Sequence, residues 1–150
     1  MKHSELYIRA LNQATDAVVA FVLGMPFRSI EADEGGGDVT VEREKSKEWL
    51  WNFWGAICYG APIAIGVQMR PNGVDKDIYA AELMHSTCEL EVYLASEEAA
   101  KLNIPYEEIR NLTMHLVDQN WHTIECFAKA LVACEKLTFN EFVAIAALTR

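Results

Sequence analysis

Hydrophobic residues recur at helical spacing over most of the chain. The first such segment begins after Ser4, a residue suited to the N-cap, and ends at Gly24, a residue suited to the position that follows a helix. From Ala14 to Leu23 this segment is apolar on nearly every side. The pattern predicts a helix of about five turns that is buried at the centre of the domain.

A short stretch of strand-like alternation comes next. Residues 26–43 alternate apolar and polar positions on both sides of Gly35, Gly36 and Gly37. Alternation at a period of two indicates half-buried strands, and consecutive glycines are typical of a turn. The sequence therefore predicts a small β-hairpin with an exposed glycine tip, inserted after the first helix.

Residues 49–67 form the most apolar segment of the chain. Its length would allow it to span a bilayer, and a tryptophan cluster at one end would suit a membrane interface. The segment also contains Asn52, Pro62 and three glycines, and amphipathic helices follow it. We interpret it as a buried core helix with a break near Pro62 and expect no membrane association, with a transmembrane helix as the alternative.

The second half of the chain predicts further helices with clear breaks. A helical region begins near Ile78 and is interrupted near residues 85–87, and residues 103–105 end the next helix and start another. Apolar positions from 109 to 142 keep helical spacing, with a bend near Asn120.

The last helix is predicted over residues 139–148. Thr138 and Glu141 have the spacing of a capping box at its start. Together these segments predict a mainly α-helical fold in which residues 1–150 form a single domain with one small β-hairpin.

Composition narrows the classes of function. The chain has 150 residues, of which 51% are hydrophobic, so it can build one substantial core. Its formal net charge of −9 and scattered basic residues argue against nucleic-acid binding. No basic start followed by an apolar core directs secretion, so we expect a cytoplasmic protein. Its cysteines are then expected to be reduced, mostly buried thiols, at positions Cys58, Cys88, Cys126 and Cys134.

Residues 11–28, LNQATDAVVAFVLGMPFR, are the most informative stretch. Their frame resembles the active-site helix in the peptidase domain of FtsH-type AAA zinc metalloproteases, where the matching segment reads HEAGHAVVA and is followed by a short strand. Asn12, Gln13 and Asp16 stand at the positions of the first His, the Glu and the second His. The resemblance implies the FtsH-type peptidase fold and a site whose chemical residues have been exchanged.

The resemblance extends along most of the chain in the same order. Residues 59–66, YGAPIAIG, resemble the family helix that packs beside the active-site helix. The stretch CELEVYLASEEA resembles the helix that carries the third metal ligand and implies that Glu89 occupies the ligand position. Residues 109–142 resemble the C-terminal part of the same domain. The family also forms ring hexamers, which implies that this chain could self-associate.

The exchanged residues change the chemistry of the motif. Two imidazoles at i and i+4 share a zinc ion, and the adjacent carboxylate acts as general base on the metal-bound water. Asn12 and Asp16 keep this spacing but offer oxygen ligands, which suit magnesium or calcium better than zinc. Gln13 has no carboxylate to accept a proton. No catalytic residue is therefore assigned, and Asn12, Asp16 and Glu89 form a candidate degenerate metal site.

Three functional hypotheses follow. The first is a non-catalytic homologue of the peptidase domain that binds a peptide or protein partner, without zinc or another cofactor, along the edge of the hairpin. The alternative is a metal-dependent peptidase or hydrolase that uses Asn12, Asp16 and Glu89 around a harder divalent cation. The third is an assembly protein, a homo-oligomer whose interface is an aromatic cluster: Trp49, Trp51, Phe53 and Trp54. The alternative for this cluster is that its rings belong to the hydrophobic core.

Two other sets of polar residues have spacings that permit a site. His85, Cys88 and Glu89 would suit a soft metal ion such as zinc. His115, Asp118 and His122 would suit a metal ion or an acid–base pair. Both sets are also typical of solvated positions on amphipathic helices.

Overall fold

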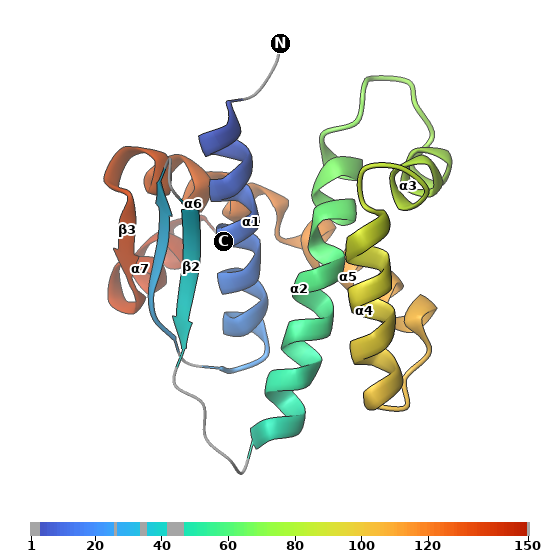
Figure 1. Cartoon of the computed structure of the whole chain (residues 1–150). Helices are drawn as coiled ribbons and strands as arrows, with labels where there is room; N and C mark the ends of the chain where they lie inside the picture. Colours follow the sequence, from blue (N-terminus) through green and yellow to red (C-terminus); the bar gives the residue numbers. More distant parts are fainter. Residues whose placement is uncertain (1–3, 26, 34–35, 42–46, 150) are drawn as a thin grey trace. The chain divides into compact units, whose positions relative to one another are not determined.

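The computed structural model describes residues 4–25, 27–33, 36–41 and 47–149 (Figure 1). These residues form seven helices and three short strands, which confirms the prediction of a mainly α-helical fold. Contacts group the chain into two compact units. The first unit comprises Met1–Glu42 and Asn120–Arg150, and the second comprises Arg43–Gln119.

Helix α1 (Glu5–Val22) is the central helix of the first unit. It begins where the sequence predicts, because the Ser4 side chain accepts a hydrogen bond of 3.1 Å from the backbone N–H of Tyr7. After the helix, Gly24 has φ of +72°, a conformation that glycine adopts without strain. Most positions from Ala14 to Ala20 are buried, as expected of a helix that is apolar nearly all round.

The predicted hairpin is present and belongs to a larger sheet. Strands β1 (Phe27–Asp33) and β2 (Gly36–Val41) pair antiparallel, with Ile30 opposite Val39. A third strand, β3 (Lys136–Thr138), pairs antiparallel with β1, so the strand order is β2-β1-β3. The sequence did not predict β3.

Strand β3 follows from the way helix α6 (Trp121–Cys134) ends. Glu135 adopts a left-handed conformation with φ of 64°, which turns the chain sharply. Its carbonyl accepts a hydrogen bond of 2.9 Å from the backbone N–H of Ala32, so the chain is attached to β1 before β3 begins. Helix α7 (Phe139–Thr149) begins directly after Thr138, whose hydroxyl accepts a hydrogen bond from the backbone N–H of Glu141, as the capping box predicts.

The core of the first unit contains a cluster of phenylalanine rings between the sheet and helices α1, α6 and α7. The rings of Phe127 and Phe142 stack with centroids 3.9 Å apart, and both side chains are fully buried. The ring of Phe27 meets that of Phe142 edge-on at 5.0 Å, and Phe21 lies 5.5 Å from the same ring. Phe142 therefore packs helix α7 against α1 and β1 from the N-terminal part of the chain and against α6 from the C-terminal part.

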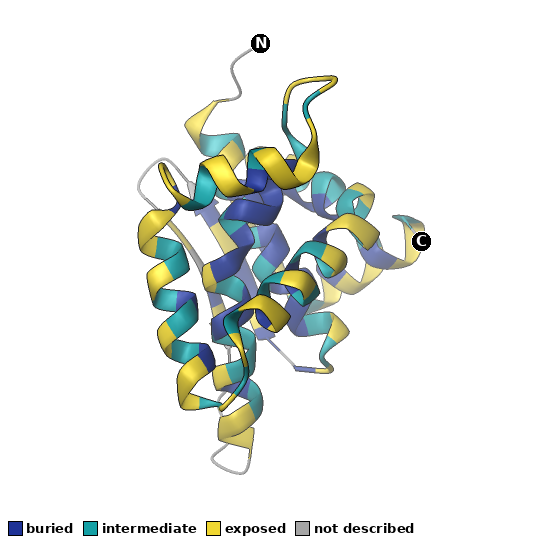
Figure 2. Cartoon of the chain, turned by 90° about the vertical axis from the view of Figure 1, so that its right-hand side faces the viewer, coloured by how far each residue is buried: buried dark blue, intermediate teal, exposed yellow. Residues whose placement is uncertain are grey.

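The second unit contains helices only. Helix α2 (Glu48–Gln68) packs against α3 (Lys76–Met84), α4 (Glu89–Lys101) and α5 (Tyr106–Gln119). The predicted interruption between α3 and α4 and the predicted helix change at Asn120 are both present. Figure 2 shows that buried and exposed residues alternate along the helices, as amphipathic packing requires.

The predicted break near Pro62 is wrong, because α2 continues through this residue. A proline inside a helix removes one backbone hydrogen bond, but the neighbouring positions Ala61, Ile63 and Ala64 are buried and hold the helix in place. Within the described ranges, α2 alone is long and apolar enough to cross a membrane by length and composition, and 50% of its apolar window is buried.

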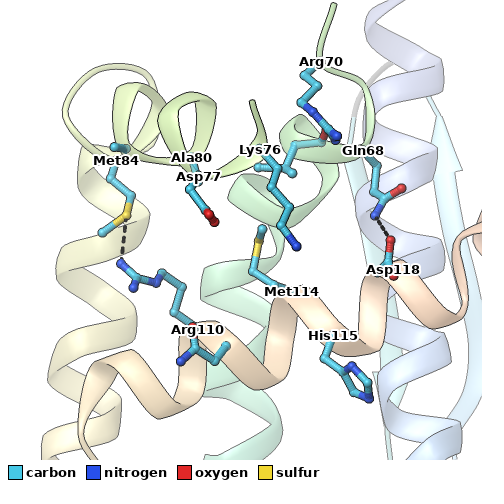
Figure 3. A pocket seen from close by; sticks show the side chains of 13 residues that line it. Gln68, Arg70, Lys76, Asp77, Ala80, Met84, Arg110, Met114, His115 and Asp118 are labelled. Atoms are coloured by element: carbon cyan, nitrogen blue, oxygen red, sulfur yellow. Dashed lines mark hydrogen bonds between the residues drawn. The ribbon is translucent and has the colours of Figure 1, made fainter. Parts of the chain in front are cut away.

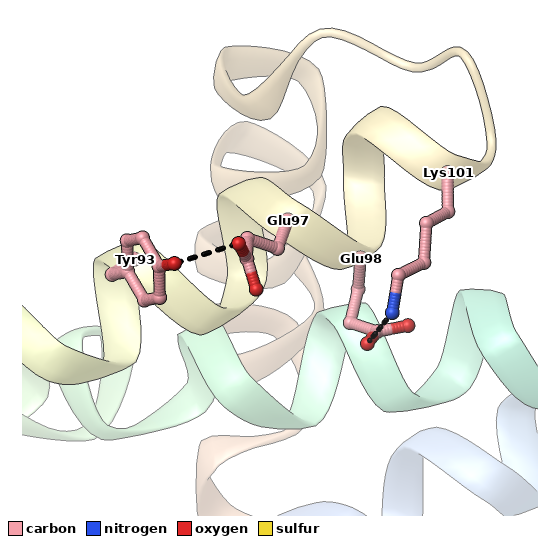
Figure 4. A network of polar contacts seen from close by, with 4 residues as sticks. All are labelled: Tyr93, Glu97, Glu98 and Lys101. Atoms are coloured by element: carbon pink, nitrogen blue, oxygen red, sulfur yellow. Dashed lines mark hydrogen bonds and ion pairs between the residues drawn. The ribbon is translucent and has the colours of Figure 1, made fainter.

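The exposed side of α4 carries two pairs of polar contacts (Figure 4). The Tyr93 hydroxyl donates a hydrogen bond of 2.7 Å to Glu97, and this bond raises the pKa of the tyrosine. One turn further on, Lys101 pairs with Glu98 at 3.0 Å. Pairs of this kind at i, i+3 and i, i+4 contribute little to stability and keep the helix surface polar.

Candidate functional site

The three residues that the sequence comparison aligned with the zinc motif lie in the middle of helix α1. Asn12, Gln13 and Asp16 are each half-buried, whereas the neighbouring Leu11 and Thr15 are fully buried. The side-chain amide of Asn12 donates a hydrogen bond of 3.1 Å to the carbonyl of Ile8, one turn earlier. The amide at the position of the first motif imidazole is thus attached to the backbone of its own helix.

Gln13 lies against strand β2. A Cβ atom built at Gly37 would lie 2.7 Å from Cγ of Gln13 and 3.0 Å from the carbonyl oxygen of Glu31. Distances this short leave no room for a side chain, so Gly37 allows the stem of Gln13 to approach the strand backbone. The sequence indicated Gly37 only as part of the hairpin tip, whereas the structure places it inside β2, paired with Ala32.

A shallow, open depression adjoins this contact. Its lining comes entirely from α1 and consists of Glu5, Ile8, Arg9, Asn12 and Gln13. Because Gln13 both lines the depression and packs on β2, the depression lies beside the strand. One acidic, one basic and two amide side chains give it a polar lining without a dominant sign of charge.

The candidate metal ligands are divided between the two units. Asn12 and Asp16 belong to the first unit, and Glu89 is the exposed first residue of α4 in the second. The degenerate site formed by Asn12, Asp16 and Glu89 stays a prediction.

The two other polar sets do not gather into metal sites. Across the part of the chain that the structure describes, no group of three or more His, Cys, Asp and Glu side chains is placed to hold a metal ion. His85 and Glu89 are exposed, whereas Cys88 is buried. Burial is the main cause that raises the pKa of the Cys88 thiol.

The cysteines are free, but the expectation that most are buried is wrong. Cys88 is buried, Cys58 and Cys126 are half-buried, and Cys134 is exposed. Cys134 is the last residue of α6, where the helix surface turns away from the core. An apolar pattern does not reveal which face a residue near a helix end will occupy.

The aromatic cluster at the start of α2 divides between core and surface. Trp51 is buried, and its ring meets that of Trp54 edge-on at 5.8 Å. Trp49 remains 55% exposed and stacks on Phe53 at 5.2 Å. The core interpretation therefore holds for Trp51, while Trp49 presents a ring to the surface.

Comparison with models of protein families finds none that matches this chain. A search of curated proteins likewise finds no match to it.

Proposed function

We propose that this chain is a non-catalytic, FtsH-type peptidase-like module that binds an extended segment of a partner protein along strand β2. The observation that carries the proposal is the contact between Gln13 and Gly37, since it joins the polar depression on α1 to an edge strand. A peptide added to β2 would run past this depression, which could receive its side chains.

Strand β2 has the properties of an edge that can accept another strand. It lies at the end of the strand order β2-β1-β3, and within the described residues only β1 pairs with it. Its sequence, GGDVTV, contains neither lysine nor proline, which natural proteins use to block strand addition. Val39 is buried and Thr40 is exposed, so one face of β2 packs inward while its outer edge offers backbone donors and acceptors.

The residues at the motif positions support binding without hydrolysis. An amide such as that of Gln13 does not accept a proton at neutral pH, so it cannot act as general base on a water molecule. The hydrogen bond from Asn12 to Ile8 and the packing of Gln13 on β2 give both side chains structural roles. Gln13, at the position that the motif reserves for the general base, here packs on the strand that would hold the peptide.

Peptide selection tests the proposal. We expect selection from a library of displayed random peptides to yield peptides that bind the protein. Their affinity is then measured by fluorescence anisotropy. Thr40→Lys, which places a charge on the exposed face of the edge strand, should weaken these binders by roughly tenfold or more. Ala144→Lys adds the same charge at an exposed position on α7 and should leave affinity unchanged.

Equal affinity for both variants, or a selection that yields no binders, would overturn the proposed site. A second copy of the chain could occupy the edge of β2 instead of a peptide, and light scattering of the unliganded protein would then detect an oligomer. In that case Thr40→Lys should convert the oligomer to a monomer, and Ala144→Lys should not.

Mass spectrometry of the same peptides tests the absence of catalysis. Selected peptides incubated with the protein and zinc, manganese, magnesium or calcium should keep their full length. Metal-dependent cleavage that disappears in Asp16→Ala would contradict the proposal and support the alternative enzyme.

A further inference from the structure

A hollow lies in the second unit, which does not contain Asn12, Gln13 or Asp16. It has a volume of about 520 Å³ and is lined by the end of α2, by α3 and by α5 (Figure 3). This volume falls within the range of pockets that bind small molecules. All its lining residues belong to the second unit.

Two of the charged groups around the hollow are already engaged. The guanidinium of Arg70 donates hydrogen bonds of 2.8 Å to the carbonyl of Val74 and of 2.8 Å to the carbonyl of Val67. The carboxylate of Asp118 accepts a hydrogen bond of 2.8 Å from the amide of Gln68. The ring of His115 points away from the other labelled side chains (Figure 3). Arg70 and Asp118 therefore have structural partners, and neither is assigned to a ligand.

Two further cations lack an anionic partner. Within the described residues, Lys76 makes no hydrogen bond or ion pair, although its ammonium reaches over the hollow toward α5 (Figure 3). The half-buried guanidinium of Arg110 donates to the sulfur of Met84 at 3.4 Å, and a thioether is a weak acceptor. A partly desolvated guanidinium is stabilised far better by a carboxylate, because charge-assisted hydrogen bonds are the stronger ones.

The remaining lining is apolar. Met84 and Met114 are half-buried on facing helices, and Val67 and Ala80 are buried beneath them. Methionine adapts its shape to aliphatic ligands because its side chain is flexible and polarizable. Figure 3 places the Arg110 guanidinium beside Met84 and the Lys76 ammonium on the other side of Met114, so a bound molecule would meet a cation at each of two parts of a deformable apolar lining.

We propose that this hollow binds a small monocarboxylate with a branched aliphatic body. Its carboxylate interacts with Arg110 beside Met84, its aliphatic body packs on Met114, and Lys76 adds positive charge at the other part of the hollow. Asp77, which also points into the hollow, opposes a second negative charge on the ligand (Figure 3). The site is independent of peptide binding at β2, so either proposal can fail without the other.

Methionine-methyl NMR tests this site directly, with 4-methylpentanoate as the probe and 4-methylpentanamide as its neutral counterpart at matched ionic strength. The carboxylate should shift the Met84 and Met114 signals with saturation, while the signal of Met25, buried in the first unit, stays in place. The amide should produce no saturable shift. Shifts of equal size with both probes, or no saturable shift with the carboxylate, would overturn the proposal.

Two substitutions at neighbouring positions, one that removes a positive charge and one that removes a negative charge, test the site further. Lys76→Gln, at an exposed position, should weaken binding of 4-methylpentanoate by roughly two- to threefold, because it removes a positive charge from the hollow. Asp77→Asn should strengthen binding severalfold, because it removes the like charge. Lys101→Gln, on the exposed part of α4, is the matched control and should change nothing. Weaker binding in Asp77→Asn, or unchanged binding in Lys76→Gln, would contradict an anion site.

Discussion

The two units of this chain bury their apolar side chains in different ways. The first unit packs large rings around Phe142 against a three-stranded sheet, whereas the second packs four helices through small residues such as Ala56, Gly60 and Ala64. A sheet leaves backbone groups unpaired at its edges, but helices satisfy their backbone internally. A partner of the first unit can therefore be recognised by backbone pairing, and a ligand of the second must be recognised by side chains.

Removing the central ring of the first unit has the largest expected effect. Phe142→Ala deletes a fully buried side chain that contacts the rings of Phe21, Phe27 and Phe127. We expect a loss of about 3–5 kcal/mol in the free energy of unfolding, measured by urea denaturation. Hydrogen exchange should show faster opening of α1, α6 and the sheet. A loss below about 1 kcal/mol would show that this ring does not organise the unit.

The contact between α1 and β2 has the next largest effect. Gly37→Ala introduces a methyl group 2.7 Å from Cγ of Gln13 and should destabilise the protein by about 1–3 kcal/mol through overpacking. Adding Gln13→Ala should recover part of this loss. A double-mutant cycle with a coupling energy near zero would show that the two residues do not touch.

Much of the fold could be predicted because its signals are local. The Ser4 cap, the apolar stretch of α1, the hairpin and the capping box at Thr138 each depend on residues close in sequence. Strand β3 was missed because it is only three residues long and follows Glu135 in a conformation that usually signals glycine. Continuity through Pro62 depends on burial, which a local pattern does not show.

The sites were harder to predict because their residues meet only through tertiary packing. The sequence marks Gln13 by its place in a motif, but nothing local indicates that it packs against Gly37 on a strand. Lys76 and Arg110 lie on separate helices, and neither belongs to a motif. Only the arrangement of α2, α3 and α5 makes them neighbours of the same hollow.

The capping box of α7 should make a moderate, pH-dependent contribution. The Thr138 backbone N–H and hydroxyl donate to Glu141 at 3.1 and 2.9 Å, and these bonds lower the pKa of the carboxyl group. A lowered folded-state pKa stabilises the protein above the unfolded pKa of about 4.3, and this stabilisation disappears as pH falls through the folded value. Thr138→Ala should cost about 1 kcal/mol in urea denaturation at pH 7.

The same substitution should cost less at acidic pH, once the pH lies below the folded-state pKa of Glu141 and the carboxyl group is protonated in both states. An equal cost at both pH values would show that Glu141 does not participate in the cap. Glu141→Gln is the matched control, since it should remove the pH dependence and retain the helix.

A smaller effect of opposite sign is expected in the second unit. Gly55 lies within α2, and a Cβ atom built there meets nothing within 4 Å. Gly55→Ala should therefore stabilise the protein by about 0.5–1 kcal/mol, because alanine favours the helix. Thermal unfolding would measure this gain. A loss of stability would indicate that α2 is not a continuous helix at Gly55. It would also contradict the difference between Gly55, which has space for a Cβ atom, and Gly37, which does not.

The smallest effect is expected on the surface of α4. Tyr93→Phe removes the hydroxyl that donates to Glu97 but keeps the ring. The free energy of unfolding should not change measurably, because exposed polar pairs contribute little. A clear loss in urea denaturation would show that this surface is packed against something else.

Hydrogen exchange of strand β2 in the presence of a selected peptide tests strand addition and the absence of catalysis together. We expect the amides of β2 to gain protection when the peptide binds, the helices of the second unit to gain none, and the peptide recovered afterwards to be intact. Protection confined to another part of the molecule would contradict strand addition, and a cleaved peptide would contradict a non-catalytic module.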